Sequence, residues 1–298
     1  MPGPVKRASV AAPLSAMLES PLKSPPPPAP VGPAPDGVRN YFTAPAAAAR
    51  YAAGRPSRHS RVLEIVAESL REFLPFAQAL DVGCGTGHST VALLPYATRV
   101  VGLDSSSAML AQAQPNPRIE YRKGYAEALP FPGGHFDLVT VSTAYHWFEH
   151  DRFLREAARV LRPDGWLVLY KAGSIGRPEQ HPDFEFWLRQ VLRVHYPKVA
   201  RNSEALTAAK AAEFGFTEAW CETTAHRQTH TLESYVDNLM THSSVIRVVD
   251  GGQESAARAR AWLRHELERF FPGGETEFTH EVRIHALRRR RDAGAAPA

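Results

Sequence analysis

Three glycines at alternate positions and two aspartates mark the part of this sequence most able to bind a ligand. Gly83, Gly85 and Gly87 stand in the stretch ALDVGCGTGHST, directly after an apolar run. Glycine lets the backbone turn sharply and approach a ligand, because no Cβ blocks the way. Asp81 precedes the glycines, and Asp104 ends the next apolar run, about twenty residues further on. This spacing is typical of a nucleotide-binding βα unit.

The flanking aspartates indicate which kind of nucleotide would fit. The dinucleotide pattern G-x-G-x-x-G requires a third glycine where this chain has His88. Asp81 would repel a pyrophosphate at the helix N-terminus and would attract an ammonium group. Asp104 can accept hydrogen bonds from both ribose hydroxyls, whereas the serines after it compete for the alternative role of helix N-cap. We therefore predict a nucleoside ligand with an amino-acid end.

The elements that must position these residues alternate between strands and helices. Such alternation argues for a parallel sheet with helices on both faces, and FDLVTVSTA reads as a strand buried on both sides. We expect strands at 78–85, 97–106, 118–124, 136–144 and 166–173, and helices at 58–74, 88–96, 107–113 and 151–162. After Gly173 the pattern predicts helices at 181–196 and 232–246 and late strands at 216–231 and 277–290.

The ends of the chain differ from this globular part. Residues 1–38 contain a dense proline cluster and few large apolar residues, so we predict a disordered tail, with a proline-module ligand or a targeting peptide as alternatives. The basic run LRRRRD at 287–292 is expected to be a solvated tail and not a nucleic-acid patch.

Composition excludes several classes of protein. Net charge is +4, no run of eighteen apolar residues is present, and no compact apolar leader is seen, so we expect a cytoplasmic protein with no membrane partner. Cys84 and Cys221 are the only cysteines, which implies no disulfide framework. His226 and His230 would lie about 13 Å apart on a strand, and Cys221 is the only thiol nearby, so no structural zinc is predicted.

Five segments in order resemble the class I S-adenosylmethionine-dependent methyltransferases, in particular the small-molecule branch that includes trans-aconitate methyltransferase-like proteins. The resemblance covers about residues 41–289 and is carried by RYAAGRP, LDVGCGTG, VVGLDSSSAML, GYAEALPFPGGHFD and AYHWFEHDRFLREAARVLRPDGWL. It implies a Rossmann-like, doubly wound, mostly parallel seven-stranded sheet with an antiparallel last strand and helical lid insertions. The domain would span 39–298, with a cap at 39–76, a cofactor-binding core at 77–173, a lid and acceptor region at 174–250 and a C-terminal helix and strand at 251–298.

The resemblance also implies roles for individual residues. Asp81 and the loop of Gly83, Cys84, Gly85 and Gly87 would hold the methionine end of S-adenosylmethionine. Asp104 and Ser105 would face the ribose, with Met109 near the adenine. The remaining cofactor contacts would be Tyr51, Arg55, Tyr125, Ala126, Glu127, Ser142 and Thr143.

This chain departs from the family pattern at two of those places. The usual acceptor for the adenine amino group is replaced by Tyr125, so the Glu127 side chain or a backbone carbonyl would substitute for it. The upstream R-P-x-Y-P motif loses its second half to SRHS.

His146 is the best candidate for a catalytic base, because it follows a strand at the carboxyl end of the sheet, where clefts form. The alternatives are a hydrogen-bonding wall of the cofactor pocket, or packing within the HWF cluster. Trp147 and Phe148 are candidates for core or for substrate contact, and His242 and Arg247 could anchor an acidic group of the acceptor.

Methylation of a small molecule by in-line displacement at an oxygen, nitrogen or carboxyl group is the leading hypothesis. A protein or RNA methyltransferase would need a broad basic groove, so a nucleic-acid partner is not expected. A protein that binds the cofactor without methylation is the third hypothesis. The acceptor and the oligomeric state stay open.

Overall fold

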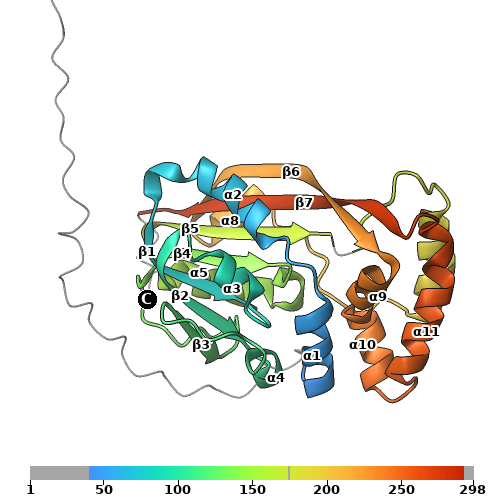
Figure 1. Cartoon of the computed structure of the whole chain (residues 1–298). Helices are drawn as coiled ribbons and strands as arrows, with labels where there is room; N and C mark the ends of the chain where they lie inside the picture. Colours follow the sequence, from blue (N-terminus) through green and yellow to red (C-terminus); the bar gives the residue numbers. More distant parts are fainter. Residues whose placement is uncertain (1–39, 174, 292–298) are drawn as a thin grey trace, which may run out of the picture.

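A seven-stranded mixed sheet forms the centre of the molecule (Figure 1). The computed structural model describes residues 40–173 and 175–291. The strands follow the order β3-β2-β1-β4-β5-β7-β6, with β7 antiparallel to both neighbours and the other pairs parallel. This confirms the predicted fold class. The strands are β1 Phe76–Val82, β2 Ala97–Asp104, β3 Ile119–Lys123, β4 Phe136–Ser142, β5 Leu161–Ala172, β6 Phe216–Thr231 and β7 Glu275–Arg289.

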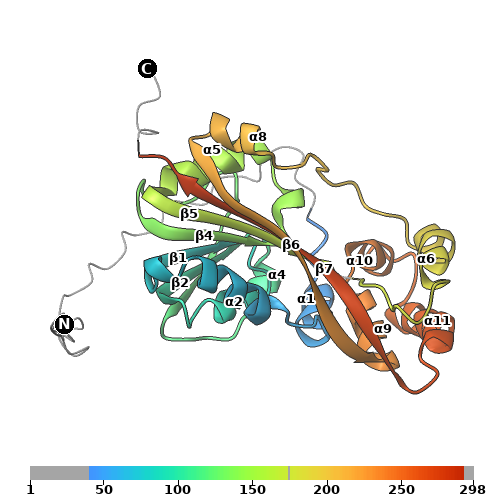
Figure 2. The same cartoon turned by 90° about the horizontal axis from the view of Figure 1, so that it is seen from above.

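Helices cover both faces of this sheet (Figure 2). One face packs against α5 (His150–Val160), whose Phe153, Leu154 and Ala157 are fully buried. The other packs against α2 (His59–Ser69) through Val62, Leu63 and Val66. Strand β4 alternates between the two cores, with Leu138 in one and Val139 in the other, as expected for a strand buried on both sides. The remaining helices near the sheet are α1 Pro45–Gly54, α3 His88–Ala92, α4 Ser107–Leu110, α8 Ala208–Glu213 and the short turns η2 Arg71–Phe73 and η3 Tyr145–Trp147.

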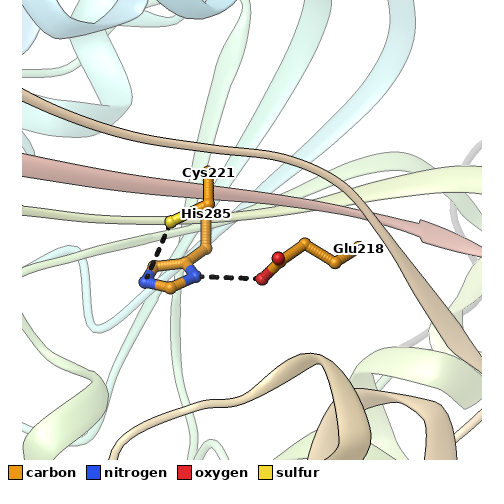
Figure 3. Close-up of side chains that lie close together, drawn as sticks. All are labelled: Glu218, Cys221 and His285. Carbon is orange, nitrogen blue, oxygen red and sulfur yellow. Dashed lines mark hydrogen bonds and ion pairs between the residues drawn. The ribbon is translucent and has the colours of Figure 1, made fainter.

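Strands β6 and β7 pair along their full length and extend beyond the other strands (Figure 2). The pairing contains one irregularity: Glu218 lies opposite Leu287 while Trp220 lies opposite Ala286, so β6 has one extra residue at this point. Such a bulge changes the face to which the following side chains point. Figure 3 shows the result, in which Glu218, Cys221 and His285 gather in one place.

The far end of the β6–β7 pair carries a second helical unit, here called the helical lobe. It has its own apolar core, in which the ring of Phe278 stacks on that of Tyr235 at 4.2 Å between centroids. Its elements are α6 Phe184–Trp187, η4 Leu188–Leu192, α7 Arg193–His195, α9 Leu232–Met240, α10 Ser243–Asp250, α11 Ala256–Leu267 and η5 Glu268–Phe270.

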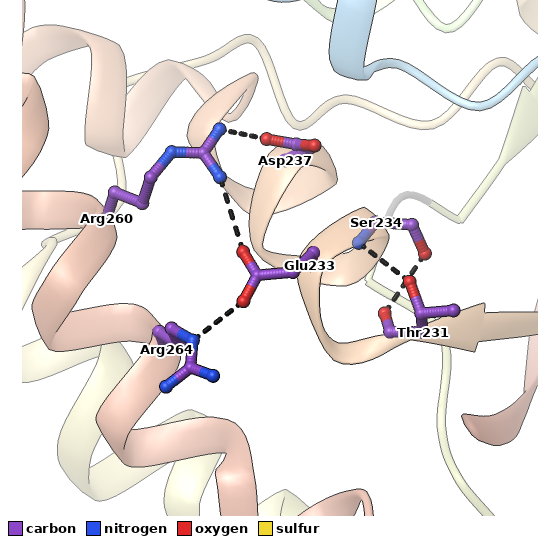
Figure 4. Close-up of polar contacts among 6 residues, drawn as sticks. All are labelled: Thr231, Glu233, Ser234, Asp237, Arg260 and Arg264. Carbon is purple, nitrogen blue, oxygen red and sulfur yellow. Dashed lines mark hydrogen bonds and ion pairs between the residues drawn. The ribbon is translucent and has the colours of Figure 1, made fainter. Parts of the chain in front are cut away.

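Polar contacts hold α9 against α11 on the surface of the helical lobe (Figure 4). The Thr231 hydroxyl caps α9 by accepting the Ser234 N–H. Glu233 accepts a hydrogen bond from Arg264 at 2.7 Å and lies 3.7 Å from Arg260, which also pairs with Asp237. These exposed pairs orient the two helices, while the buried aromatic core beneath them supplies most of the stabilisation.

Two expectations about the C-terminal half are wrong. The run LRRRRD is not a solvated tail, because Arg289 donates to the Leu161 carbonyl, Arg290 to that of Ala212, and Arg291 pairs with Asp164. The helix expected over 232–246 is two helices, since the chain turns at Thr241 and His242 between α9 and α10.

The proline-rich tail at 1–38 lies outside the described residues. No helix in the described part is long and apolar enough to cross a membrane.

Candidate functional site

The glycine-rich loop between β1 and α3 forms the floor of a cleft. All three glycines have a positive φ, of 73° at Gly83, 56° at Gly85 and 81° at Gly87, which strains any residue with a side chain. A Cβ on Gly83 would lie 2.6 Å from the Cβ of Ala144. The three glycines are therefore required by the backbone. Gly83 and Gly85 line the cleft, whereas Gly87 packs against the ring of Tyr121.

Asp104 ends β2 and lines the same cleft. Its Oδ2 accepts the Gly85 N–H and its Oδ1 accepts the Ser106 N–H, both at 2.8 Å. Ser106, and not Asp104, caps α4 through the Met109 N–H, so the competing N-cap role is filled by a serine. The carboxylate lines the cleft, and each oxygen can accept more than one hydrogen bond. Burial raises the pKa of Asp104, and the backbone N–H groups of Ser106, Gly85 and Ser105 oppose that rise.

Most of the residues predicted for the site come together around this cleft. Besides Gly83, Gly85 and Asp104, the wall contains Tyr51, Arg55, Ser105, Met109, Tyr125, Ala126, Glu127, Ser142, Thr143, His146, Trp147 and His242. Sequence reasoning missed several further lining residues, among them Asn40, Tyr41, Phe42 and Arg201. The first three belong to the cap and Arg201 to the segment after α7, where no motif pointed to them.

Four predicted residues do not line the cleft, and Asp81 is the most informative of them. Its side chain is completely buried and accepts hydrogen bonds from the hydroxyls of Ser89, Thr90 and Thr140 at 2.6, 2.8 and 3.0 Å. The direct ammonium contact expected of Asp81 is therefore replaced by a structural role, in which the carboxylate ties α3 and β4 to β1. The others are Cys84, which is buried behind the loop, Gly87, and Arg247 on α10.

Aromatic and cationic side chains from distant segments close over the cleft. Trp147 lies 5.8 Å from the ring of Tyr41 and 6.3 Å from that of Phe42, between centroids. Arg55 lies over the ring of Tyr51 at 5.5 Å and donates to the Thr241 hydroxyl at 3.3 Å. The cap and the helical lobe thus both contribute to the cleft that the sheet opens.

The base-recognition loop after β3 keeps one acidic group at the cleft wall. Glu127 Oε1 accepts the Glu149 N–H at 2.9 Å, and Glu127 lines the cleft. Burial is the largest influence on Glu127 and raises its pKa. Glu127 and Tyr125 both lie on the cleft wall.

A second, larger cavity, here called the groove, adjoins the cleft. Thr143, His146, Arg201 and His242 line both cavities, so the two meet at these side chains. Thr143 has a φ of 54°, a strained value for a β-branched residue, and such strain often marks functional positions.

The groove wall carries unpaired positive charge. Three of its four acidic side chains already pair with arginines: Glu185 with Arg189 at 2.6 Å, Glu281 with Arg283 at 3.8 Å, and Glu179 with Arg227 at 3.9 Å. Four cationic side chains of the wall form no ion pair within the described residues, namely Lys171, Arg193, Lys198 and Arg201. They are close enough to affect one another, because Arg193, then burial and then Arg201 lower the pKa of Lys198.

His146 sits at the junction of the cleft and the groove. Its imidazole makes no hydrogen bond within the described part of the chain and lies 4.7 Å from the ring of Trp147, between centroids. Burial, followed by the charges of Arg201 and Lys171, lowers the pKa of His146 to about 3. The ring is therefore neutral near pH 7 and binds a proton weakly.

Comparison with known proteins agrees with this site. Residues 80–169, from β1 to β5, match a family model described as a methyltransferase domain. The chain carries a methyltransferase domain. S-adenosylmethionine is the cofactor of that domain, and the resemblance deduced from the five sequence segments is confirmed.

Three curated relatives match this part of the chain. Trans-aconitate 2-methyltransferase of Deinococcus radiodurans is 43% identical over 101 residues, which are 32% of this chain and 38% of the relative. A candidate methyltransferase of Dictyostelium discoideum is 38% identical over 95 residues, which are 32% of this chain and 36% of the relative. The uncharacterised methyltransferase YcgJ of Bacillus subtilis is 37% identical over 133 residues, which are 42% of this chain and 51% of the relative. The chain thus spans about a third to a half of the length of these relatives.

Solved structures extend the likeness of fold over most of the chain. A candidate type II methyltransferase from Anaeromyxobacter dehalogenans has a TM-score of 0.59 at 24% identity and covers 75% of this chain and 95% of its own. The [4+2]-cyclase SpnF has a TM-score of 0.50 at 20% identity, and the likeness covers 84% of this chain and 94% of the cyclase. The same fold therefore occurs in a protein named for a different reaction, so the site must support the argument for methyl transfer.

The residues of the cleft fit S-adenosylmethionine. Gly83 and Gly85 leave open a cradle that a Cβ would narrow, and the Asp104 carboxylate lines it at the end of β2. Asp104 would hold the ribose, Glu127 the adenine amino group, and Arg55 the carboxylate of the methionine end. When bound, the cofactor supplies a methyl group on a positively charged sulfur.

Proposed function

We propose that this protein transfers the methyl group of S-adenosylmethionine to a small anionic acceptor, most simply a carboxylate. The observation that carries the proposal is the junction between the cleft and the groove, where Thr143, His146, Arg201 and His242 line both. An acceptor bound in the groove would reach the donor cleft only at this junction.

The charge of the groove supports an anionic acceptor. Arg201 lies over the ring of Trp147 at 4.9 Å and donates to the Ser243 hydroxyl at 2.7 Å. Its guanidinium is thus held at the junction, with no acidic partner in the part of the chain that the structure describes. Lys171 lines the groove and is close enough to His146 to lower its pKa. Together these side chains would hold a carboxylate with charge-assisted hydrogen bonds.

The properties of His146 also favour an acceptor that is already ionised. A general base works best when its pKa lies near the working pH, and the pKa of His146 is about 3. Removing a proton from an alcohol or a phenol with this imidazole would be strongly uphill. A carboxylate carries no such proton at neutral pH, so His146 would act as a wall of the junction that donates or accepts one hydrogen bond.

The test is a panel of carboxylates, phosphates, phenols and amines offered with radiolabelled S-adenosylmethionine. We expect label in carboxylates and none in phenols or amines. Labelling of phenols or amines alone would refute the anionic acceptor while leaving methyl transfer intact. Tight cofactor binding with no labelled product from any class would favour a non-methylating protein. A product on RNA or on a polypeptide would favour the second hypothesis from the sequence.

Variants of the groove would test the charge argument directly. Lys171→Gln should raise the KM for the acceptor by roughly two- to fivefold, in a salt-dependent way, because an exposed cation contributes little. Arg201→Gln should raise it by about 10- to 150-fold, as expected for a hydrogen bond to a charged group. Arg201 also lines the cleft, so the cofactor Kd must be measured beside it. Arg264→Gln is the matched control, because Arg264 pairs with Glu233 on the helical lobe and neither residue lines the groove.

A further inference from the structure

Glu218, Cys221 and His285 form a cluster of three metal-ligating side chains on the β6–β7 pair (Figure 3). Cys221 and His285 are directly opposed in the register of the two strands. Glu218 precedes Cys221 by three residues, a spacing that places side chains on opposite faces of a regular strand. The bulge between Glu218 and Trp220 adds one residue to β6 and so brings Glu218 to the face of Cys221.

The imidazole of His285 lies between the other two groups. Its Nε2 is 3.9 Å from Cys221 Sγ, and its Nδ1 is 3.5 Å from Glu218 Oε2. Nδ1 is shielded from solvent and has no hydrogen-bond partner among the described residues. One ligand atom from each residue lies within 4.8 Å of the others.

We propose that Glu218, Cys221 and His285 bind a divalent zinc-type ion, with water in the fourth position. Thiolate, imidazole and carboxylate are the ligands that zinc takes in proteins, and three of them with an open position form a complete tetrahedral set. On binding, the S–H bond of Cys221 breaks, the sulfur bonds to the metal, and the proton passes to the buffer. The thiolate and the carboxylate then balance the two charges of the ion.

The distances are compatible with this assignment. Bond lengths of about 2.0–2.3 Å and a tetrahedral angle require ligand atoms about 3.3–3.6 Å apart. The three atoms, now within 4.8 Å, would need to approach by at most about 1.5 Å. The ion takes one ring nitrogen, so the imidazole turns or Glu218 swings toward it. Cys221 is exposed and Glu218 is half-buried.

In the sequence, the histidines near Cys221 are His226 and His230, and their spacing predicts no structural zinc site. That prediction missed His285, because that residue is 64 positions away and meets Cys221 only through the pairing of β6 with β7. None of the three residues lines the donor cleft, although His285 lines the groove.

The experiment uses the full chain, free of any histidine tag, titrated with Zn²⁺ by calorimetry and with Co²⁺ by absorption spectroscopy. We expect one ion per chain and a thiolate-to-cobalt charge-transfer band. Zn²⁺ at about a hundred times its Kd should raise the Tm by roughly 5–10 °C.

Cys221→Ser and His285→Ala should each weaken binding at least ~10-fold and remove or reduce the charge-transfer band. Thr223→Ala is the matched control, an exposed residue on the same face of β6 that offers no ligand. Far-ultraviolet circular dichroism and the Tm without metal show whether each variant folds. No binding to the unmodified chain, or unchanged binding in both ligand variants, would overturn the proposal.

Discussion

Replacing Asp104 by asparagine separates two roles that this residue fills at once. Its two carboxylate oxygens each accept one backbone N–H, from Gly85 and from Ser106, at 2.8 Å. Asparagine has only one carbonyl oxygen, so one of these N–H groups would face an amide NH₂. An unpaired buried donor costs about 1–3 kcal/mol of unfolding free energy, which corresponds to a fall in Tm of roughly 2–12 °C.

The same change should weaken cofactor binding by more than disorder of the glycine loop alone would weaken it. A ribose hydroxyl bonded to a charged carboxylate contributes about 1.5–3 kcal/mol, so the Kd for S-adenosylmethionine should rise about 10- to 150-fold. The measurement is calorimetric titration of the cofactor at a temperature where both proteins are folded.

Asp137→Asn is the matched control for Asp104→Asn. Asp137 is a buried acid at the amino end of β4, whereas Asp104 lies at the carboxyl end of β2. Asp137 accepts the Gln78 N–H at 2.8 Å and pairs with Arg162 at 2.5 Å. Its replacement should lower stability and leave the cofactor Kd unchanged. If Asp104→Asn raised the Kd no more than Asp137→Asn does, Asp104 would only order the glycine loop and the ribose assignment would be wrong.

Two further predictions concern pH and packing. His280 is buried, donates from Nδ1 to the Gly173 carbonyl at 2.7 Å and accepts from Arg58 at Nε2, and burial followed by Arg58 lowers its pKa to about 3. Between pH 6.5 and 3 the histidine binds a proton in the unfolded chain but not in the folded one. The free energy of unfolding therefore decreases as the pH is lowered, by up to about 1.4 kcal/mol per pH unit. In urea unfolding at several pH values, His280→Gln should flatten this slope, whereas the exposed His265→Gln should not; equal slopes would contradict the pKa argument. Phe278→Ala should cost about 3–5 kcal/mol of unfolding free energy, because Phe278 is fully buried at the centre of the helical lobe. A loss below about 1 kcal/mol would mean that this lobe tolerates a cavity at its centre.

The glycine motif, the ribose acid and the alternation of elements could be predicted because each depends on local spacing. Gly83 needs a left-handed backbone next to Ala144, and that requirement is visible as a glycine in the sequence. Asp104 stands at a strand end that the apolar pattern marks. These constraints act over a few residues, so a single sequence carries them.

Residues brought together by long-range packing could not be predicted in this way. Arg201 enters the cleft from the segment after α7, and no neighbouring pattern distinguishes it from other surface arginines. The position of Asp81 directly before the glycines predicts a contact with the ligand. The hydroxyls of Ser89, Thr90 and Thr140 instead donate hydrogen bonds to its carboxylate inside the protein. The arginines of 288–291 similarly found partners on distant elements, including Asp164 and the Leu161 carbonyl.

The position of β7 has a consequence for the order in which the chain can assemble as it leaves the ribosome. Strand β7 lies between β5 and β6, although it is the last strand to be synthesised. Until Glu275–Arg289 emerges, β6 has no neighbour through which to join the sheet, and α9 and α10, which follow β6, have no fixed place. Domains form largely in the order of synthesis, so β1 to β5 can pair early. The donor cleft, which needs Thr241 and Ser243, is completed only after translation has passed the final strand.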